Sequence, residues 1–350
     1  MSQAFGWALG LVLVAVGGVG PLWWLTGCSG PEPQKAQLPT LDDGADPQKK
    51  TEFGTGGGAD KDIGVKFDPD RALKYLKQLC DIGPRISATD GMKQQQALVE
   101  KHFKGLGATV TRQEFKARQK SRKDDTDFVN LVASWNPDKA KRVLLCTHYD
   151  TRPIADQEAN PKNWTKPFVS ANDGTSGVAF LMELGHHMKD LKCEYGVDFV
   201  LFDGEEYVFE TNRMGGGDRY FIGSDHFADE YLKSKDKRKF KYEAGVLFDL
   251  FAGKDADLRV EVYSYESAKP LVDQIWGTAK AVGARSFRYE RGYEVQDDHL
   301  ALNRAGIPTV DVIDFDYPHW HKLSDTADKV SGAQLAEVSK VITTWLQKIK

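Results

Sequence analysis

The sequence predicts an α/β fold in which a mostly parallel, mixed β-sheet is flanked by helices on both faces. Apolar runs of strand length alternate with segments of helical periodicity from about residue 66 to the C-terminus. This alternation is typical of a parallel sheet covered by helices. The run 199–202 is wholly apolar, as expected for a strand that is buried on both faces. Several such runs end at acidic residues or histidines, which places polar side chains at one edge of the sheet.

The helices are predicted from capping residues and apolar periodicity. Asp68 and Pro69 supply an N-cap and a first-turn proline for the first helix, and Gly107 ends the second, which spans about 92–106. Further helices are expected over 178–188, 269–282 and 333–349, with a short one after residue 299. Strands are expected over 108–115, 130–135, 143–146, 199–202, 244–248, 259–263 and 308–313.

The N-terminal residues predict export from the cytoplasm. Residues 5–25 are almost wholly apolar, which is typical of a signal peptide or a membrane anchor. Residues 25–28 (LTGC) resemble a bacterial lipobox, whose cysteine carries lipid after cleavage. No Lys or Arg precedes Lys35, so an uncleaved anchor is the alternative, with Trp23 and Trp24 at the membrane interface. Both alternatives place the protein in the bacterial cell envelope, outside the cytoplasm and attached to a membrane.

The composition divides the chain into three parts. Residues 1–28 form the signal peptide or anchor with its lipobox-like end. Residues 29–65 are rich in Pro, Gly, Asp, Lys and Gln, and their few large apolar side chains cannot offset the entropy of ordering. We therefore expect a flexible linker there, followed by a single catalytic domain over 66–350.

Charge and cysteine content exclude two classes of protein. The formal net charge of −4 and the isoelectric point near 6.1 give no electrostatic basis for binding nucleic acid. The basic loop 116–123 is followed at once by Asp124 and Asp125, as in a solvated surface loop. At most one disulfide can form in the predicted domain, so its fold depends on a hydrophobic core. The cysteines of that domain are Cys80, Cys146 and Cys193.

Side chains of metal-ligand type follow several of the predicted strands. They are His148, Glu205, Glu206, Asp249 and His321, joined by Asp173 at the start of a helix. One polar residue after a strand is chance, but several from strands expected to lie side by side indicate a shared site. Imidazole and carboxylate ligands without cysteine suit zinc. The adjacent glutamates allow one to bind metal while the other moves protons.

Six short motifs contain these residues or lie between them in the sequence. They are HYD at 148–150, ANDG at 171–174, FDGEE at 202–206, FDL at 248–250, QDDH at 296–299 and WH at 320–321. In order and spacing they resemble the zinc glutaminyl cyclases and their relatives, the zinc aminopeptidases. The resemblance covers roughly residues 67–350 and implies that the substrates are the N-termini of peptides or proteins.

The cyclase pattern implies one zinc ion, held by Asp173, Glu206 and His321. It also implies that Glu205 is the general acid and base. Zinc would polarise the γ-carboxamide of an N-terminal glutamine while the α-amine of the same peptide attacks it. Glu205 would then carry a proton from that amine to the departing ammonia. Attack within one molecule needs no water nucleophile, so holding the peptide in a cyclised pose supplies much of the rate.

Four further residues complete the implied cyclase site. Asp249 and Asp297 would form a carboxyl network beside the general base. Trp320 would wall the substrate pocket, with Tyr317 nearby. A dry aromatic wall would help to exclude hydrolysis.

The aminopeptidase pattern uses the same residues differently. There His148 and Asp249 would join a second zinc, and Asp173 would bridge the two ions. Glu205 would activate a water that cuts the first peptide bond. Every ligand for that second zinc is present, so the sequence does not exclude two ions. One ion is expected, because cyclases that resemble this chain can retain these residues without filling the second site.

Two segments favour the cyclase and two favour the peptidase. QDDH at 296–299 and PHWH at 318–321 look more like cyclases. Thr211 stands where animal cyclases have a tryptophan, and HKLSDT at 321–326 resembles peptidases. We predict the cyclase, with the aminopeptidase as the alternative. A catalytically inactive binding domain is a third hypothesis, although no ligand is missing, and no feature of the sequence indicates an oligomeric state.

Overall fold

The computed structural model describes residues 64–211 and 217–350. The predicted anchor at 1–28 and nearly all of the predicted linker at 29–65 lie outside the described residues and stay predictions. The described residues all belong to one compact unit of the chain. Among them there is no helix that is both long enough and apolar enough to cross a membrane.

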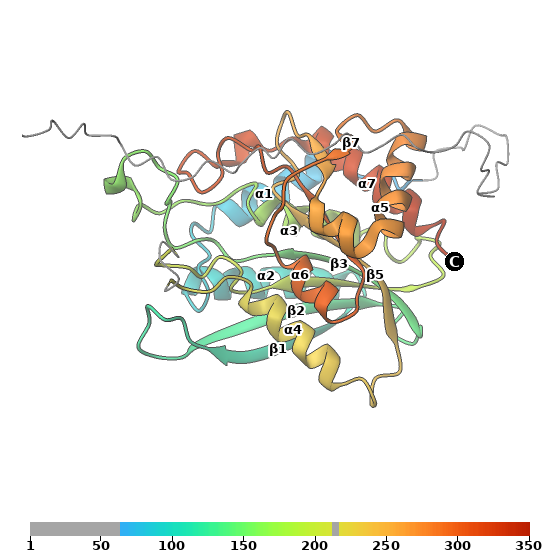
Figure 1. Cartoon of the computed structure of the whole chain (residues 1–350), viewed down its shortest axis with the longest axis horizontal. Coiled ribbons are helices and arrows are strands. Elements are labelled where there is room, and N and C mark those ends of the chain that lie inside the picture. Colours follow the sequence, from blue (N-terminus) through green and yellow to red (C-terminus); the bar gives the residue numbers. More distant parts are fainter. Residues whose placement is uncertain (1–63, 212–216) are drawn as a thin grey trace, which may run out of the picture. The chain divides into compact units, whose positions relative to one another are not determined.

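Six strands form one mixed sheet at the centre of this unit (Figure 1). In their hydrogen-bonded order they are β1 (Thr109–Ala117), β2 (Thr126–Trp135), β4 (Gly196–Phe202), β3 (Lys141–His148), β5 (Lys241–Asp249) and β8 (Thr309–Ile313). β4, β3, β5 and β8 run parallel to one another. β1 and β2 are antiparallel to their neighbours. The predicted α/β fold with a mixed, mostly parallel sheet is confirmed.

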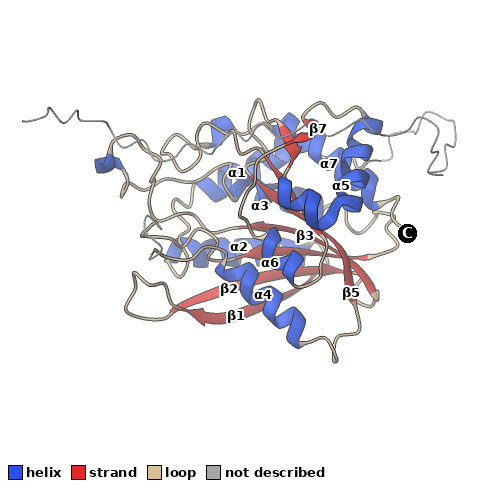
Figure 2. Ribbon diagram, viewed as in Figure 1, coloured by secondary structure: helices blue, strands red, loops and turns tan. Residues whose placement is uncertain are grey.

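Helices cover both faces of the sheet (Figure 2). They are α1 (Pro69–Cys80), α2 (Asp90–Gly105), α3 (Thr175–Gly185), α4 (Ile222–Lys233), α5 (Val262–Val282), α6 (His299–Arg304) and α7 (Gly332–Leu346). α1, α2, α3, α5 and α7 pack on one face, and α4 and α6 pack on the other. Phe199 and Leu201 of β4 point into the first layer, whereas Val200 and Phe202 point into the second. Burial on both faces explains why this strand is wholly apolar.

One predicted strand ends earlier than expected. The strand predicted over 259–263 is wrong beyond residue 260, because Glu261 begins a helix there. Its carboxylate accepts hydrogen bonds from the backbone N–H groups of Tyr263 and Ser264, which caps α5. The remaining strand joins a separate two-stranded sheet, made of β6 (Leu258–Val260) and β7 (Phe287–Arg291).

The sequence does not predict α4, because the start of this helix carries no capping signal. Phe221 is its N-cap residue, adopts a left-handed φ of 62°, and makes no side-chain capping hydrogen bond. α4 is stabilised by tertiary packing instead, since Phe227, Ala228 and Tyr231 lie in the core between this helix and the second face of the sheet.

A buried ion pair joins β3 to β4 at the end of the sheet remote from the polar strand ends. Arg142 donates to both carboxylate oxygens of Asp198, at 2.8 and 2.5 Å, and both side chains are almost fully buried. The Tyr242 hydroxyl donates to the same carboxylate at 2.5 Å. Asp198→Ala would leave the guanidinium buried and unpaired, so we expect the free energy of unfolding to fall by about 3–5 kcal/mol in urea titrations.

The matched control for this variant is Asp125→Ala. Asp125 pairs with Arg118 at 2.7 Å, but both side chains are about half exposed. We expect a loss of at most about 1 kcal/mol for this variant. Equal losses for the two variants would contradict the assignment of Arg142 and Asp198 as a buried structural pair.

Candidate active site

The carboxyl ends of three neighbouring strands bring the predicted site residues to one edge of the sheet. His148 is the last residue of β3 and Asp249 the last residue of β5. Glu205 and Glu206 follow β4, which pairs between β2 and β3. Asp173 comes just before α3, on the turn that leads into that helix. Neighbouring parallel strands end at the same edge, as the sequence predicts.

Gly174 allows this turn to approach β3 closely. Its φ of 72° lies in the left-handed region, and an added Cβ would stand only 2.5 Å from the His148 ring. Any larger residue would therefore push Asp173 away from His148.

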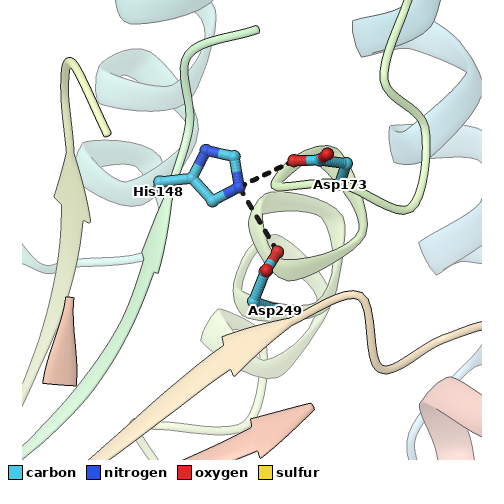
Figure 3. Close-up of side chains that lie close together, drawn as sticks. All are labelled: His148, Asp173 and Asp249. Atoms are coloured by element: carbon cyan, nitrogen blue, oxygen red, sulfur yellow. Dashed lines mark ion pairs between the residues drawn. The ribbon is translucent and has the colours of Figure 1, made fainter. Parts of the chain in front are cut away.

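His148, Asp173 and Asp249 form the first cluster of the site (Figure 3). His148 Nε2 lies 3.1 Å from an oxygen of Asp173 and 3.3 Å from an oxygen of Asp249. Figure 3 shows the imidazole directed between the two carboxylates, which come from different elements. The sequence-based grouping of these three residues corresponds to one cluster in the structure.

Asp173, Glu206 and His321 form the second cluster. His321 Nε2 lies 3.0 Å from Glu206 Oε1 and 3.6 Å from the second oxygen of Asp173. Asp173 thus belongs to both clusters and offers one oxygen to each. His321 has a left-handed φ of 51°, a strained conformation of the kind that concentrates at functional sites.

Several buried polar atoms of the two clusters make no hydrogen bond of acceptable geometry within the described residues. These atoms are both ring nitrogens of His148, Oδ2 of Asp173, Oδ1 of Asp249 and Nδ1 of His321. Buried polar groups are normally satisfied, and leaving them unpaired is costly. Bound cations would satisfy the carboxylate oxygens and Nε2 of His148, and this donor set suits zinc. The site therefore has the ligands of a zinc enzyme.

Burial and charge separate the two adjacent glutamates. Burial and the neighbouring Glu206 carboxylate raise the pKa of Glu205 well above its usual value. Burial acts in the same direction on Glu206, but Arg152 and His321 outweigh it and hold the pKa of Glu206 below its usual value. A glutamate that can carry a proton beside one that stays anionic fits an acid–base catalyst beside a metal ligand.

Asp150 holds the two glutamates in place. Its carboxylate accepts the backbone N–H of Glu205 at 3.2 Å and that of Glu206 at 3.0 Å. The sequence-based reasoning missed this role, although Asp150 is the third residue of the HYD motif. Its place shortly after a predicted strand, in the same motif as His148, was a signal that could have found it.

Asp325 plays the corresponding part for Asp173. Its carboxylate accepts the backbone N–H groups of Asn172 and Asp173, at 2.9 and 3.2 Å. The Tyr317 hydroxyl donates to the same carboxylate at 2.7 Å. The sequence pattern offered only one signal for Asp325, its place in the peptidase-like HKLSDT segment.

Asp297 is buried and feels the charge of Asp249. Burial and the Asp249 charge raise the pKa of Asp297 well above its usual value. One oxygen of Asp297 accepts the backbone N–H of Asp298 at 2.5 Å, and the other is buried without a hydrogen bond in the described chain. Burial of this kind favours the protonated form of the Asp297 carboxyl group. The catalytic roles of Asp249 and Asp297 stay predictions.

The two predicted substrate-binding aromatics lie on the loop that carries His321. Trp320 is half-buried, and its ring centroid lies 4.1 Å from that of His321 and 5.1 Å from that of Phe315. Tyr317 is buried, and its hydroxyl is committed to Asp325. Trp320 is the more accessible of the two, and substrate contact by either stays a prediction.

Tyr317→Phe tests which part of this side chain matters. The substitution keeps the ring but removes the hydrogen bond to the Asp325 carboxylate. We expect the free energy of unfolding to fall by about 1.5–3 kcal/mol, with little change in KM. A raised KM at unchanged stability would show instead that Tyr317 acts on the substrate.

Fold and site together define a class, the α/β metalloenzymes whose metal ligands follow the strands of a mostly parallel sheet. The model of the peptidase family M28 matches residues 130–346, and the chain belongs to this family. The predicted relationship to the cyclases and aminopeptidases of this superfamily is confirmed.

Two solved structures and one further relative are similar to this chain. The crystal structure of Fimbriiglobus ruber glutaminyl cyclase is 55% identical, with a TM-score of 0.81, over 82% of this chain and 97% of that chain. A leucine aminopeptidase precursor from Bacteroides thetaiotaomicron is 30% identical, with a TM-score of 0.75, over 82% and 99%. The glutaminyl-peptide cyclotransferase of Bos taurus is 21% identical over 254 residues, or 63% of this chain. The match spans 65% of the bovine protein, which is less than two thirds of its length.

Proposed function

We propose that the protein is a zinc-dependent glutaminyl-peptide cyclotransferase, which converts the N-terminal glutamine of peptides or proteins to pyroglutamate and releases ammonia. The observation that carries the proposal is the 55% identity to the Fimbriiglobus ruber glutaminyl cyclase over 97% of that chain. The clustering of Asp173, Glu206 and His321 supports the proposal, because these three residues are the zinc ligands that the cyclase pattern implies.

The chemistry divides between the metal and the side chains around it. Bound by Asp173, Glu206 and His321, zinc would act as a Lewis acid on the γ-carboxamide of the glutamine. Glu205 accepts the proton of the attacking α-amine and returns it to the departing ammonia. Its raised pKa suits both halves of that task, and Asp150 fixes its backbone.

Water must be kept from competing with the α-amine. Trp320 is positioned to do this, since its ring packs beside the His321 ring at the proposed ligand set. The peptide is both nucleophile and electrophile, so the site needs only to hold it folded back on itself.

A single zinc ion is the proposed metal content. Burial lowers the pKa of His148, but Asp150, Asp173 and Asp249 outweigh burial and raise that pKa well above its usual value. A protonated His148 would offset one of the two carboxylate charges of the first cluster without a second ion.

The aminopeptidase is the second candidate, and the complete first cluster favours it. The two activities are tested by comparing a glutamine-initiated with a leucine-initiated peptide, together with zinc counted by elemental analysis. A cyclase with one zinc turns over the first peptide only and releases ammonia. Release of leucine by protein carrying two zinc ions would establish the aminopeptidase.

The proposed location is the outer side of a bacterial membrane, reached through the segment that ends at Cys28. The described chain begins beside α7, where the Val65 N–H donates to the Thr343 hydroxyl at 3.2 Å. The start of α7 is bonded to Ala252, close to Asp249, and Thr343 lies about 18 Å further along the helix. The described chain therefore begins at the end of α7 that is remote from the site. Fatty-acid labelling that is lost in Cys28→Ala supports the lipoprotein, and labelling unchanged in that variant contradicts it.

A further inference from the structure

The Arg152 side chain is buried behind the second cluster, where it contacts three side chains. Its exposed fraction is 0%. Nη1 donates to Glu206 Oε2 at 2.8 Å. Nε and Nη2 donate to the two oxygens of Asp156 at 2.9 and 3.2 Å, and Nη2 also donates to the Tyr220 hydroxyl at 3.0 Å.

We infer that Arg152 is a positioning residue that prepares two of the three proposed zinc ligands, Glu206 directly and His321 through Asp156. The inference rests on the metal site within the proposed function. It does not depend on whether that site cyclises or hydrolyses its substrate.

The direct effect falls on Glu206. Its Oε2 is occupied by Arg152, whereas its Oε1 faces His321 Nε2 at 3.0 Å. The bond to Arg152 therefore favours Oε1 as the oxygen that would bind a metal, because Oε1 faces the other proposed ligands. A single oxygen from this residue leaves room for the open coordination position that a catalytic zinc site requires.

The indirect effect falls on His321. Its Nδ1 lies 3.0 Å from Asp156 Oδ1, in a charge contact that falls short of hydrogen-bond geometry. The carboxylate nevertheless favours the proton on Nδ1 and leaves Nε2 for the metal. Asp156 is itself held by two of the three donating nitrogens of Arg152. The guanidinium thus fixes the carboxylate that faces the histidine ring.

Arginine suits this position because three fixed donors are used at once. A lysine would keep the positive charge, but its single ammonium cannot span Glu206 and Asp156 in the same way. The geometry, and not only the charge, is therefore what Arg152→Lys removes.

Zinc affinity and the cobalt spectrum of the metal-exchanged protein test this inference without measuring activity. For Arg152→Lys we expect zinc binding to weaken by about 10–100-fold in competition with a chelator. We also expect the visible absorption of the cobalt-loaded protein to change, because Glu206 is freed to bind through both oxygens. Tyr220→Phe is the matched control, since it removes one partner of the same guanidinium but no ligand contact. It is expected to keep wild-type affinity and spectrum.

Asp156→Asn provides the second test and removes only the branch that leads to His321. We expect weaker zinc binding for this variant, and an effect in the double variant with Arg152→Lys that is smaller than the product of the single effects. Wild-type affinity and spectrum in Arg152→Lys would overturn the inference. If that variant does not fold without metal, wild-type zinc binding by folded Asp156→Asn overturns the positioning of His321 through Asp156 instead. A fully multiplicative double variant would contradict the route through Asp156.

Discussion

Replacing Glu205 by glutamine is expected to lower kcat on a glutamine-initiated peptide by about 10²–10⁴-fold, the usual contribution of a general acid–base catalyst. The substitution keeps the size of the side chain but removes its ability to accept a proton. Asp150 bonds only the backbone of this residue, so the variant should fold and present the same ligands. Steady-state kinetics with a coupled ammonia assay measures the effect.

Zinc content distinguishes loss of the catalyst from loss of the metal. Glu205→Gln should bind zinc as the wild-type protein does, because the proposed ligand is the adjacent Glu206. Activity within a factor of a few of wild type would remove Glu205 from the mechanism. Loss of zinc in this variant would mean that the two glutamates have exchanged roles.

Replacing Asp173 by asparagine is expected to abolish both zinc binding and activity, since Asp173 offers an oxygen to each cluster. Zinc at about 1,000 times its Kd should add about 4 kcal/mol to the free energy of unfolding of the wild-type protein. That increment should disappear in Asp173→Asn, as measured by thermal unfolding with and without zinc.

Asp249→Asn is the matched comparison, because Asp249 belongs to the first cluster only. With one zinc in the second cluster, this variant keeps the stabilisation by zinc but loses activity through the carboxyl network. Loss of one of two zinc ions would instead favour a two-metal site. Asp173→Asn with full zinc content would contradict the assignment of the site.

The order of strands and helices and most of the proposed metal ligands could be predicted, because they depend on the pattern of apolar and polar residues along short segments. The apolar run 199–202 is buried on both faces of the sheet, and the polar residues after such strands must meet at its edge. His148 and Asp249 follow from that rule alone. Grouping His321 with Glu206 required the family resemblance, because His321 comes from a long loop after β8.

The supporting residues could not be predicted in the same way. Arg152 and Asp156 lie on a loop without periodicity, and their burial depends on the path of that loop through the fold. No sequence pattern predicts a role for His299, which is fully buried with Nε2 at 3.2 Å from Glu261. Glu261 also caps α5, so one carboxylate serves a helix and a buried histidine at once. Neither the capping of α5 by Glu261 nor its contact with His299 has a local sequence signal.

The most direct test of the proposed cyclase is the mass of the product formed from a glutamine-initiated peptide in water labelled with heavy oxygen. Zinc-loaded protein should yield the full-length peptide reduced by one ammonia and free of heavy oxygen, and Glu205→Gln should yield almost none. Free glutamine carrying heavy oxygen, with a peptide shortened by one residue, would contradict the cyclase and identify an aminopeptidase.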